Sequence, residues 1–162
     1  MTGGALRLYD GLLKRPPTQY WFTEWTRRLN SGRTVASAAD EFLRASDSPY
    51  KGLSNTPFVD ALYSNVLRRT GDPSRRAIWI ARLNNGSWTR GEVAREFIEG
   101  PENKRLTTID LKAIELYRTL LRRLPTRSEY TPLLASIRDG SSTLNEVATV
   151  LLGSEEYAAR FT

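Results

Sequence analysis

The sequence predicts an all-α protein built from three tandem copies of a three-helix unit of about 54 residues. Three segments share one pattern: "LYDGLLKR" at 8–15, "LYSNVLRR" at 62–69 and "LYRTLLRR" at 116–123. Their tyrosines, Tyr9, Tyr63 and Tyr117, are each 54 residues apart. Apolar residues recur three and four positions apart, which is typical of a helix face, and the alternating patterns of strands are nearly absent.

The repeats are expected over about 5–54, 57–107 and 110–162. Helices of this length cannot bury their apolar faces alone, so the three copies must pack against one another. We therefore expect a single helical domain over residues 1–162, either a compact bundle or a short array.

Each unit opens with a helix that has one apolar face. The apolar residues at helical spacing are Tyr9, Leu12 and Leu13; then Val59, Leu62, Tyr63, Val66 and Leu67; then Ala113, Tyr117, Leu120 and Leu121. The other face carries Asp, Ser, Asn and Arg, as expected for a helix that packs on one side only.

The second helix of each unit follows a turn, "RPPTQ", "TGDPS" or "LPTRS". In the middle unit Asp72 is expected to be the N-cap, with Pro73 at the first helical position. Pro132 is expected to delay or kink the first turn of the third unit's helix. All three helices should end at glycines in a left-handed conformation: Gly32, Gly86 and Gly140.

Bulky residues align inside these second helices, which predicts that they lie in the core: Trp25, Trp79 and Leu133. The third helix opens with a capping box in two units, Thr89 with Glu92 and Thr143 with Glu146. The first unit has "TVAS" at this place, without an acid and one residue shorter. Its Phe42 therefore corresponds to Phe97 and Leu151 only after a shift of one residue.

The composition argues against an enzyme. The chain contains no Cys, so it has no disulfide and no thiolate metal site. It also contains no His, the residue that most often acts as a general base at neutral pH. Glu92 and Glu96 share a helix face, but Arg90 and Arg95 nearby should keep both acids ionised. We expect no catalytic residues, no metal site and no cofactor.

The charge favours acidic partners. The net charge is +6, carried by 20 Arg and four Lys. Such a surface can attract an acidic protein, an anionic glycan or nucleic acid, or it can simply be solvated. No stretch reaches the roughly 18 apolar residues that cross a bilayer, so membrane insertion is not expected. The chain is compatible with being part of a larger polypeptide.

Four residues are candidates for ligand binding: Trp88, Asn84, Asn85 and Trp21. The repeat equivalents of Trp88 and Trp21 are not aromatic. In "NNGSWT", an exposed indole could stack on a sugar ring while the amides bond its hydroxyls. The alternative is that Trp88 is a hydrophobic staple at a helix start, and for Trp21 an internal packing role is favoured.

A second set of candidates consists of arginines in the middle unit that could contact an acidic partner: Arg68, Arg69, Arg75 and Arg76. Arginine suits paired contacts with carboxylates. Because Arg15, Arg69 and Arg123 recur at one place in every unit, a role in the fold of each unit is the favoured alternative for them. Nucleic-acid binding is disfavoured, because no separate basic recognition helix is present.

The motifs "LYxxxLxR", "TRxEVAREFI" and "SEEY" resemble a bacterial helical repeat domain of unknown function. That domain occurs in extracellular, surface-layer and calcium-repeat proteins and is similar to phycobilisome linker domains. The resemblance implies an extracellular or cell-surface location, with a cytoplasmic one left open. It also implies a non-enzymatic interaction module that binds a protein or a glycan, or a linker-like scaffold that binds acidic proteins.

The sequence departs from that family in three respects. The family's glycine before the repeated arginine is replaced by Lys14, Arg68 and Arg122. The family's loop aspartate is kept only as Asp72, and the Gly/Asp nonapeptide repeats are absent. Calcium binding is therefore not implied for this chain.

Overall fold

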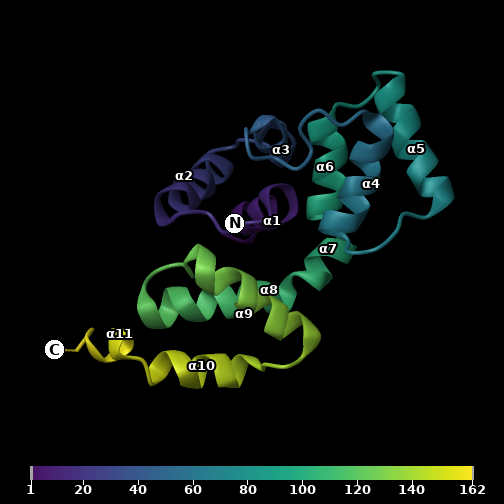
Figure 1. The fold of residues 1–162 in the computed structure, drawn as a ribbon. Helices are drawn as coiled ribbons and strands as arrows, with labels where there is room; N and C mark the ends of the chain where they lie inside the picture. The colour runs from purple at the N-terminus through teal and green to yellow at the C-terminus, as the bar shows by residue number, and fades with distance from the viewer. Residues whose placement is uncertain (1, 162) are drawn as a thin grey trace.

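The computed structural model describes residues 2–161 and confirms the all-α repeat (Figure 1). No strand occurs among these residues. The first unit contains α1 (Thr2–Leu13), α2 (Gln19–Asn30) and α3 (Val35–Arg44), and the second contains α4 (Asn55–Val66), α5 (Pro73–Asn84) and α6 (Arg90–Glu99). The short α7 (Pro101–Leu106) leads to the third unit, whose elements are α8 (Thr108–Leu116), the π-helical turn η1 (Tyr117–Leu121), α9 (Arg127–Asp139), α10 (Leu144–Leu152) and α11 (Glu155–Ala158).

The second helix of every unit begins at a side-chain cap. Thr18, Asp72 and Thr126 each accept a hydrogen bond from the backbone N–H three residues later. The predicted cap at Asp72 is confirmed. The expected delay at Pro132 was wrong, because a capping box between Thr126 and Glu129 secures the first turn of α9 before the proline is reached.

Two sets of left-handed residues end helices in each unit. The predicted glycines Gly32, Gly86 and Gly140 have φ of 94°, 70° and 78°. The second set, at the end of each unit's first helix, consists of Lys14, Arg68 and Arg122, with φ of 53°, 56° and 57°. A glycine would adopt this conformation without steric cost, so side chains kept here need a compensating role.

For two of these basic residues the role is contact with the next unit. The Lys14 ammonium donates to the carbonyl oxygen of Asn65 in the second unit. The Arg68 guanidinium donates to Asp110 in the third, at 2.6 Å. Arg122 makes no such contact among residues 2–161.

The core is continuous through the three units and is formed by the aligned apolar positions. Both predicted capping boxes of the third helices are present, at Thr89 and Thr143, and Phe42, Phe97 and Leu151 are all buried as the shifted alignment requires. The most extensive contact between two helices joins α3 and α6.

The second helix of the middle unit departs from the expected core. Trp25 and Leu133 are buried, but Trp79 is only half-buried. The reason is the position of α5, which lies at the outer edge of the molecule and packs chiefly on α4, so that none of its residues is fully buried (Figure 1).

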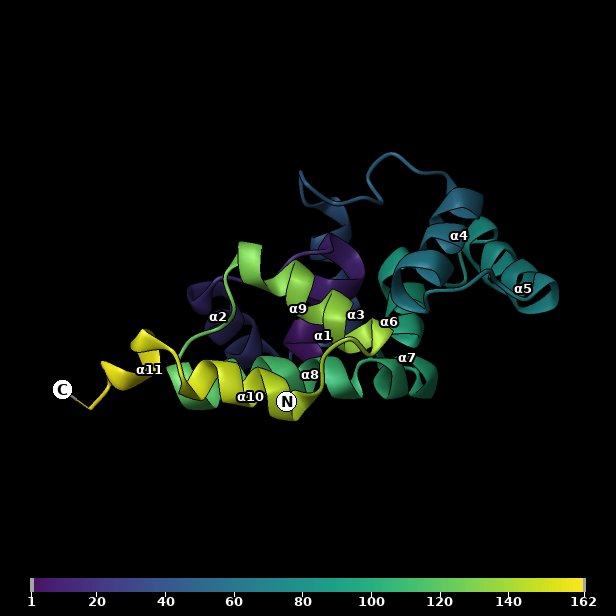
Figure 2. The same ribbon diagram turned by 60° about the horizontal axis from the view of Figure 1, so that its bottom comes forward.

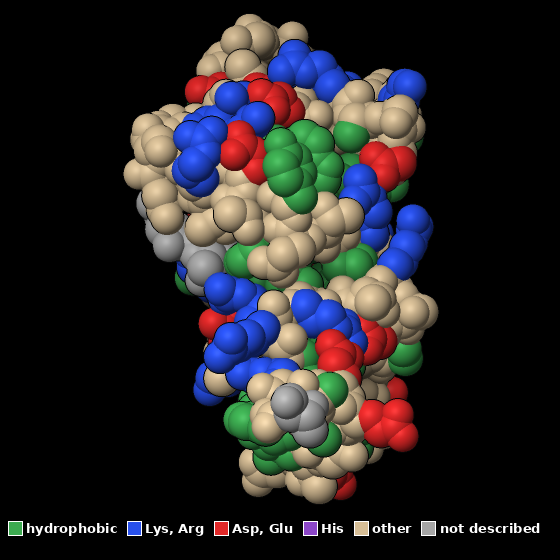
Figure 3. All heavy atoms as spheres, turned by 90° about the vertical axis from the view of Figure 1, so that its left-hand side faces the viewer, with side chains coloured by type: hydrophobic (Ala, Val, Ile, Leu, Met, Phe, Trp, Pro, Cys, Tyr) green, Lys and Arg blue, Asp and Glu red, His purple; other side chains and the backbone are tan. Residues whose placement is uncertain are grey.

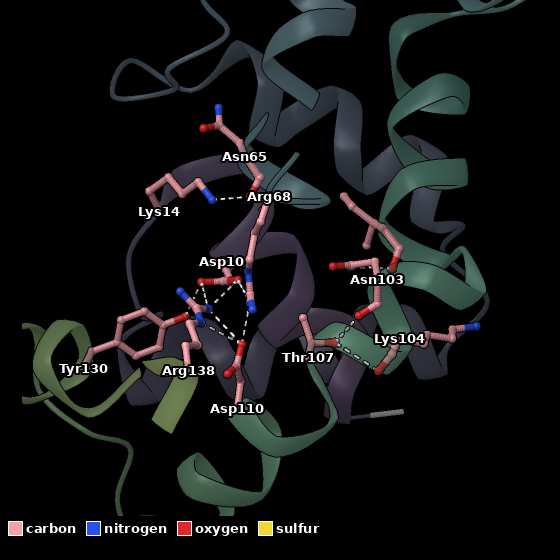
Figure 4. Close-up of polar contacts among 12 residues, drawn as sticks. Asp10, Lys14, Asn65, Arg68, Asn103, Lys104, Thr107, Asp110, Tyr130 and Arg138 are labelled. Atoms are coloured by element: carbon pink, nitrogen blue, oxygen red, sulfur yellow. Dashed lines mark hydrogen bonds and ion pairs between the residues drawn. The ribbon is translucent and has the colours of Figure 1, made fainter. Parts of the chain in front are cut away.

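A polar cluster joins all three units (Figure 4). Asp10 on α1, Arg68 after α4, Asp110 on α8 and Arg138 on α9 form ion pairs, with Arg138 bonded to Asp110 at 2.8 Å and to Asp10 at 3.1 Å. The Tyr130 hydroxyl donates to Asp10 at 3.0 Å. Burial, together with the negative charge of Asp10, raises the pKa of Tyr130, so the phenol keeps its proton and acts as a donor.

Candidate binding grooves

A recurring arginine closes each unit on itself. Arg15, Arg69 and Arg123 each pair with a carboxylate that follows the third helix of the same unit: Asp47, Glu102 and Glu156, at 2.7, 2.6 and 2.6 Å. The same guanidinium lies 5.5, 5.2 and 5.5 Å from the ring centre of the repeated tyrosine. Hydrogen bonding to the arginine lowers the pKa of each carboxyl group. These contacts explain why an arginine recurs at this place in every unit: it holds the unit together, which agrees with the structural role favoured from the sequence.

In the second unit an open groove of about 390 Å³ lies next to these contacts, between α4, α5 and α6. Its floor is aromatic: the Tyr63 and Phe97 rings meet edge to face at 4.8 Å, and Trp79 lies 5.8 Å from Phe97. Ile78, 51% exposed, forms part of the wall. The groove is open because α5 stands away from the core.

The rim of this groove is basic. Arg69, Arg75 and Arg82 line it together with Glu96 and Glu102. Arg69 forms an ion pair with Glu102, and Arg82 lies over the Trp79 and Trp88 rings. The Arg75 side chain makes no hydrogen bond or ion pair with any residue that the structure describes. Arg75 is therefore the rim cation available to a carboxylate from outside.

The first unit has an equivalent groove of about 330 Å³, lined by Tyr9, Trp25 and Phe42. Trp21 stands on its rim at the position that Arg75 occupies in the second unit. In the third unit this position is Glu129, which pairs with Arg123 at 2.7 Å across the corresponding site. In the three units this repeat position is thus an aromatic residue, an arginine without an ion pair in the described residues, and a glutamate that is paired with an arginine.

The candidate residues Trp88, Asn84 and Asn85 are engaged within the protein. The half-buried Trp88 ring lies 5.7 Å from Trp79 and is covered by Arg82. The Asn84 side-chain oxygen accepts from Asn55 at 2.9 Å, and Asn85 accepts from the backbone N–H of Ser87. The structure therefore places these three residues in packing and loop contacts.

Trp21 has the opposite environment to the one favoured from the sequence. It is 42% exposed, beside Tyr20 at 69%, with ring centres 5.1 Å apart. The preference for internal packing was wrong, because α2 turns this side of its first turn to solvent. Figure 3 shows exposed hydrophobic side chains at the height of α2.

The four candidate arginines do not form one patch. Arg68 belongs to the polar cluster between units, Arg69 is bound to Glu102, and Arg76 is paired with Asp60. Of these four arginines, Arg75 alone makes no ion pair within residues 2–161. On the face seen in Figure 3, basic and acidic side chains lie next to one another rather than forming a broad basic surface.

The model of a family described as "Domain of unknown function (DUF4214)" matches residues 37–107, which cover most of α3, the whole second unit and α7. This match supports a helical domain of unknown function. No curated protein and no solved structure matches the chain.

Residues 2–161 contain neither a candidate metal site nor a candidate membrane-spanning helix. No group of three or more acidic residues is placed to hold a metal ion there. Within the same residues, no helix has the length and apolar character needed to cross a bilayer.

Proposed function

We propose that this chain is a non-enzymatic interaction module and that the groove of the second unit binds an acidic segment of a partner protein. One observation carries the proposal: an open groove with an aromatic floor has at its rim an arginine, Arg75, whose guanidinium makes no hydrogen bond or ion pair within residues 2–161. An acidic segment with an apolar side chain fits both features.

The two contacts would contribute in different ways. An aromatic side chain of the partner, placed on Trp79 and Phe97, buries about 150–250 Å² and supplies most of the affinity. A carboxylate next to it pairs with Arg75 and sets the direction of the segment. Because Arg75 is exposed, its share of the affinity should fall as salt is added.

The test is a fluorescence anisotropy titration of the full chain. The probe is a labelled peptide with one phenylalanine flanked by aspartates and glutamates, and the same peptide with lysines in place of the acids is the comparison. We expect micromolar binding of the acidic peptide only, weakened at least tenfold by Arg75→Glu. The matched control is Arg44→Glu, which reverses an exposed charge outside the groove. Equal binding by the two variants, or no binding by the wild type, would reject the groove.

A second candidate function is glycan binding, favoured by the exposed Tyr20–Trp21 pair, of which Trp21 lines the groove of the first unit. An indole face beside a groove can stack on a sugar ring. A glycan array run with wild type and Trp21→Ala tests this function. If glycan binding persists in Trp21→Ala, the glycan site does not include Trp21. If the wild type binds no glycan on the array, the glycan-binding function is rejected.

The extracellular or cell-surface location and the likeness to phycobilisome linkers are proposals that rest on the resemblance of the motifs. A linker-like scaffold agrees with binding of acidic proteins by the second-unit groove. Nucleic-acid binding is disfavoured further, because many arginines are already paired with carboxylates or stacked on aromatic rings.

A further inference from the structure

The first two units pair through one stripe of the third helix. The stripe positions are Ala36, Ala39, Asp40 and Leu43 in α3, and Gly91, Ala94, Arg95 and Ile98 in α6. Leu43 and Ile98 are only 8% and 0% exposed. The backbones approach closely, since a methyl group added at Gly91 would lie 2.3 Å from the carbonyl oxygen of Ala36.

This pairing is reciprocal. Ala36 and Gly91 occupy the same repeat position, and each lies against the other. The Gly91 N–H also donates to Asp40 at 2.9 Å, one turn further along the same stripe. Contact between equivalent positions is the property of an interface with approximate two-fold symmetry. The repeat unit therefore carries a surface that recognises a second copy of itself.

The third copy of this stripe is largely uncovered, with three of its four residues exposed and Ala148 half-buried. In α10 it consists of Asn145, Ala148, Thr149 and Leu152. The helix packs on α8, η1 and α11 with its other side, and it lies at the outer edge of the molecule (Figures 1 and 2). Leu152 is 46% exposed, although its counterparts Leu43 and Ile98 are buried.

The uncovered stripe is also uncharged, unlike its two counterparts. One stripe position is Asp40 in α3 and Arg95 in α6 but the neutral Thr149 in α10. Three units can form one such pair, which leaves one copy without a partner. Covering the stripe of α10 therefore buries no ionised group, and the desolvation cost is limited to the Asn145 and Thr149 side chains.

We propose that α10 binds α10 of a second copy of this chain, with the reciprocal geometry that α3 and α6 use within one copy. Asn145 is larger than Ala36 and Gly91, so the two helices cross nearer Ala148, the smallest residue of the stripe. Leu152 of each copy then packs on its partner helix. A single helix pair buries less than the roughly 1,600 Å² of a standard interface, so the dimer should be weak, with micromolar dissociation.

The first test is sedimentation equilibrium of the full chain over a range of concentrations. We expect a monomer–dimer equilibrium in the wild type and at least tenfold weaker dimerisation in Leu152→Glu. The control is Val150→Glu on the same helix. Val150 is 71% exposed and lies off the stripe, and its counterparts are Glu41 and Glu96, so dimerisation should not change. Both substituted residues are exposed, and circular dichroism verifies that each variant is folded.

A second test locates the two-fold axis of the proposed dimer. Because the chain has no cysteine, Ala148→Cys introduces a single thiol. Near a two-fold axis this thiol should form a disulfide with its copy, and Val150→Cys should react much more slowly. A monomer at all concentrations, a dimer that Leu152→Glu leaves intact, or equal cross-linking of the two cysteine variants would overturn the proposal.

Discussion

The substitution Asp110→Ala should destabilise the protein by about 2–3 kcal/mol. The Asp110 side chain is 4% exposed, and its Oδ2 accepts from Arg68 at 2.6 Å and from Arg138 at 2.8 Å. Removing it leaves two guanidinium groups that share the single carboxylate of Asp10. The cluster joins all three units, so its loss should weaken the docking of the third unit on the first two.

The magnitude follows from burial. Removing one member of a buried ion pair costs about 3–5 kcal/mol. Two effects reduce this cost. The remaining arginines, Arg68 and Arg138, are 27% and 30% exposed and can recover some hydration. The other Asp110 oxygen, Oδ1, is buried without a hydrogen-bond partner, and deleting it removes a desolvation penalty of about 1–3 kcal/mol.

The assay is equilibrium unfolding in urea followed by circular dichroism. The matched control is Asp60→Ala, which breaks an aspartate–arginine pair whose side chains are 47% and 34% exposed and should cost about 1 kcal/mol or less. The reasoning is refuted if the two substitutions lower the free energy of unfolding by the same amount. A double-mutant cycle with Arg138→Met should give a coupling energy of about 1–3 kcal/mol.

Three further predictions concern single positions. Gly91→Ala should cost about 1–3 kcal/mol in a urea titration because its methyl group meets a backbone oxygen, whereas Gly153→Ala, whose nearest atom would be 3.4 Å away, should be tolerated. Arg122→Gly should raise the free energy of unfolding by about 0.5–1 kcal/mol, because it relieves a left-handed backbone; a loss of stability would contradict this account. The Arg123 hydrogen bonds lower the pKa of Glu129 from 4.5 to about 2, so the stabilisation by Glu129 is fully present above pH 4.5 and is lost as the pH falls toward 2. At pH 7 Glu129→Gln should therefore be less stable than the wild type by about 1 kcal/mol, after allowance for solvent screening, and acid titrations of the two proteins should converge near pH 2.

Much of the fold could be predicted from local chemistry. The caps at Asp72, Thr89 and Thr143 depend on hydroxyl or carboxyl groups within three residues of the amide that they serve. The left-handed glycines at helix ends depend on a single backbone angle. Such features are short-range, so a sequence pattern is sufficient to find them.

The candidate site was predicted only in part. The repeat alignment singled out the position of Trp21, Arg75 and Glu129, which proved to lie on the groove rim. It did not indicate that Trp21 is exposed or that Trp88 is covered by Arg82. Those properties depend on how far each second helix stands from the core, which the spacing of apolar residues does not encode.

The sequence by itself determined that this protein is a threefold helical repeat, because periodicity, caps and glycines act within one unit. Only the tertiary structure decided which repeat units pack on one another, which arginines form ion pairs, and which helix faces remain exposed. The physical reason is that an identical stripe or side chain is buried or exposed according to its neighbour in space. Three similar units in one chain cannot all have the same neighbours.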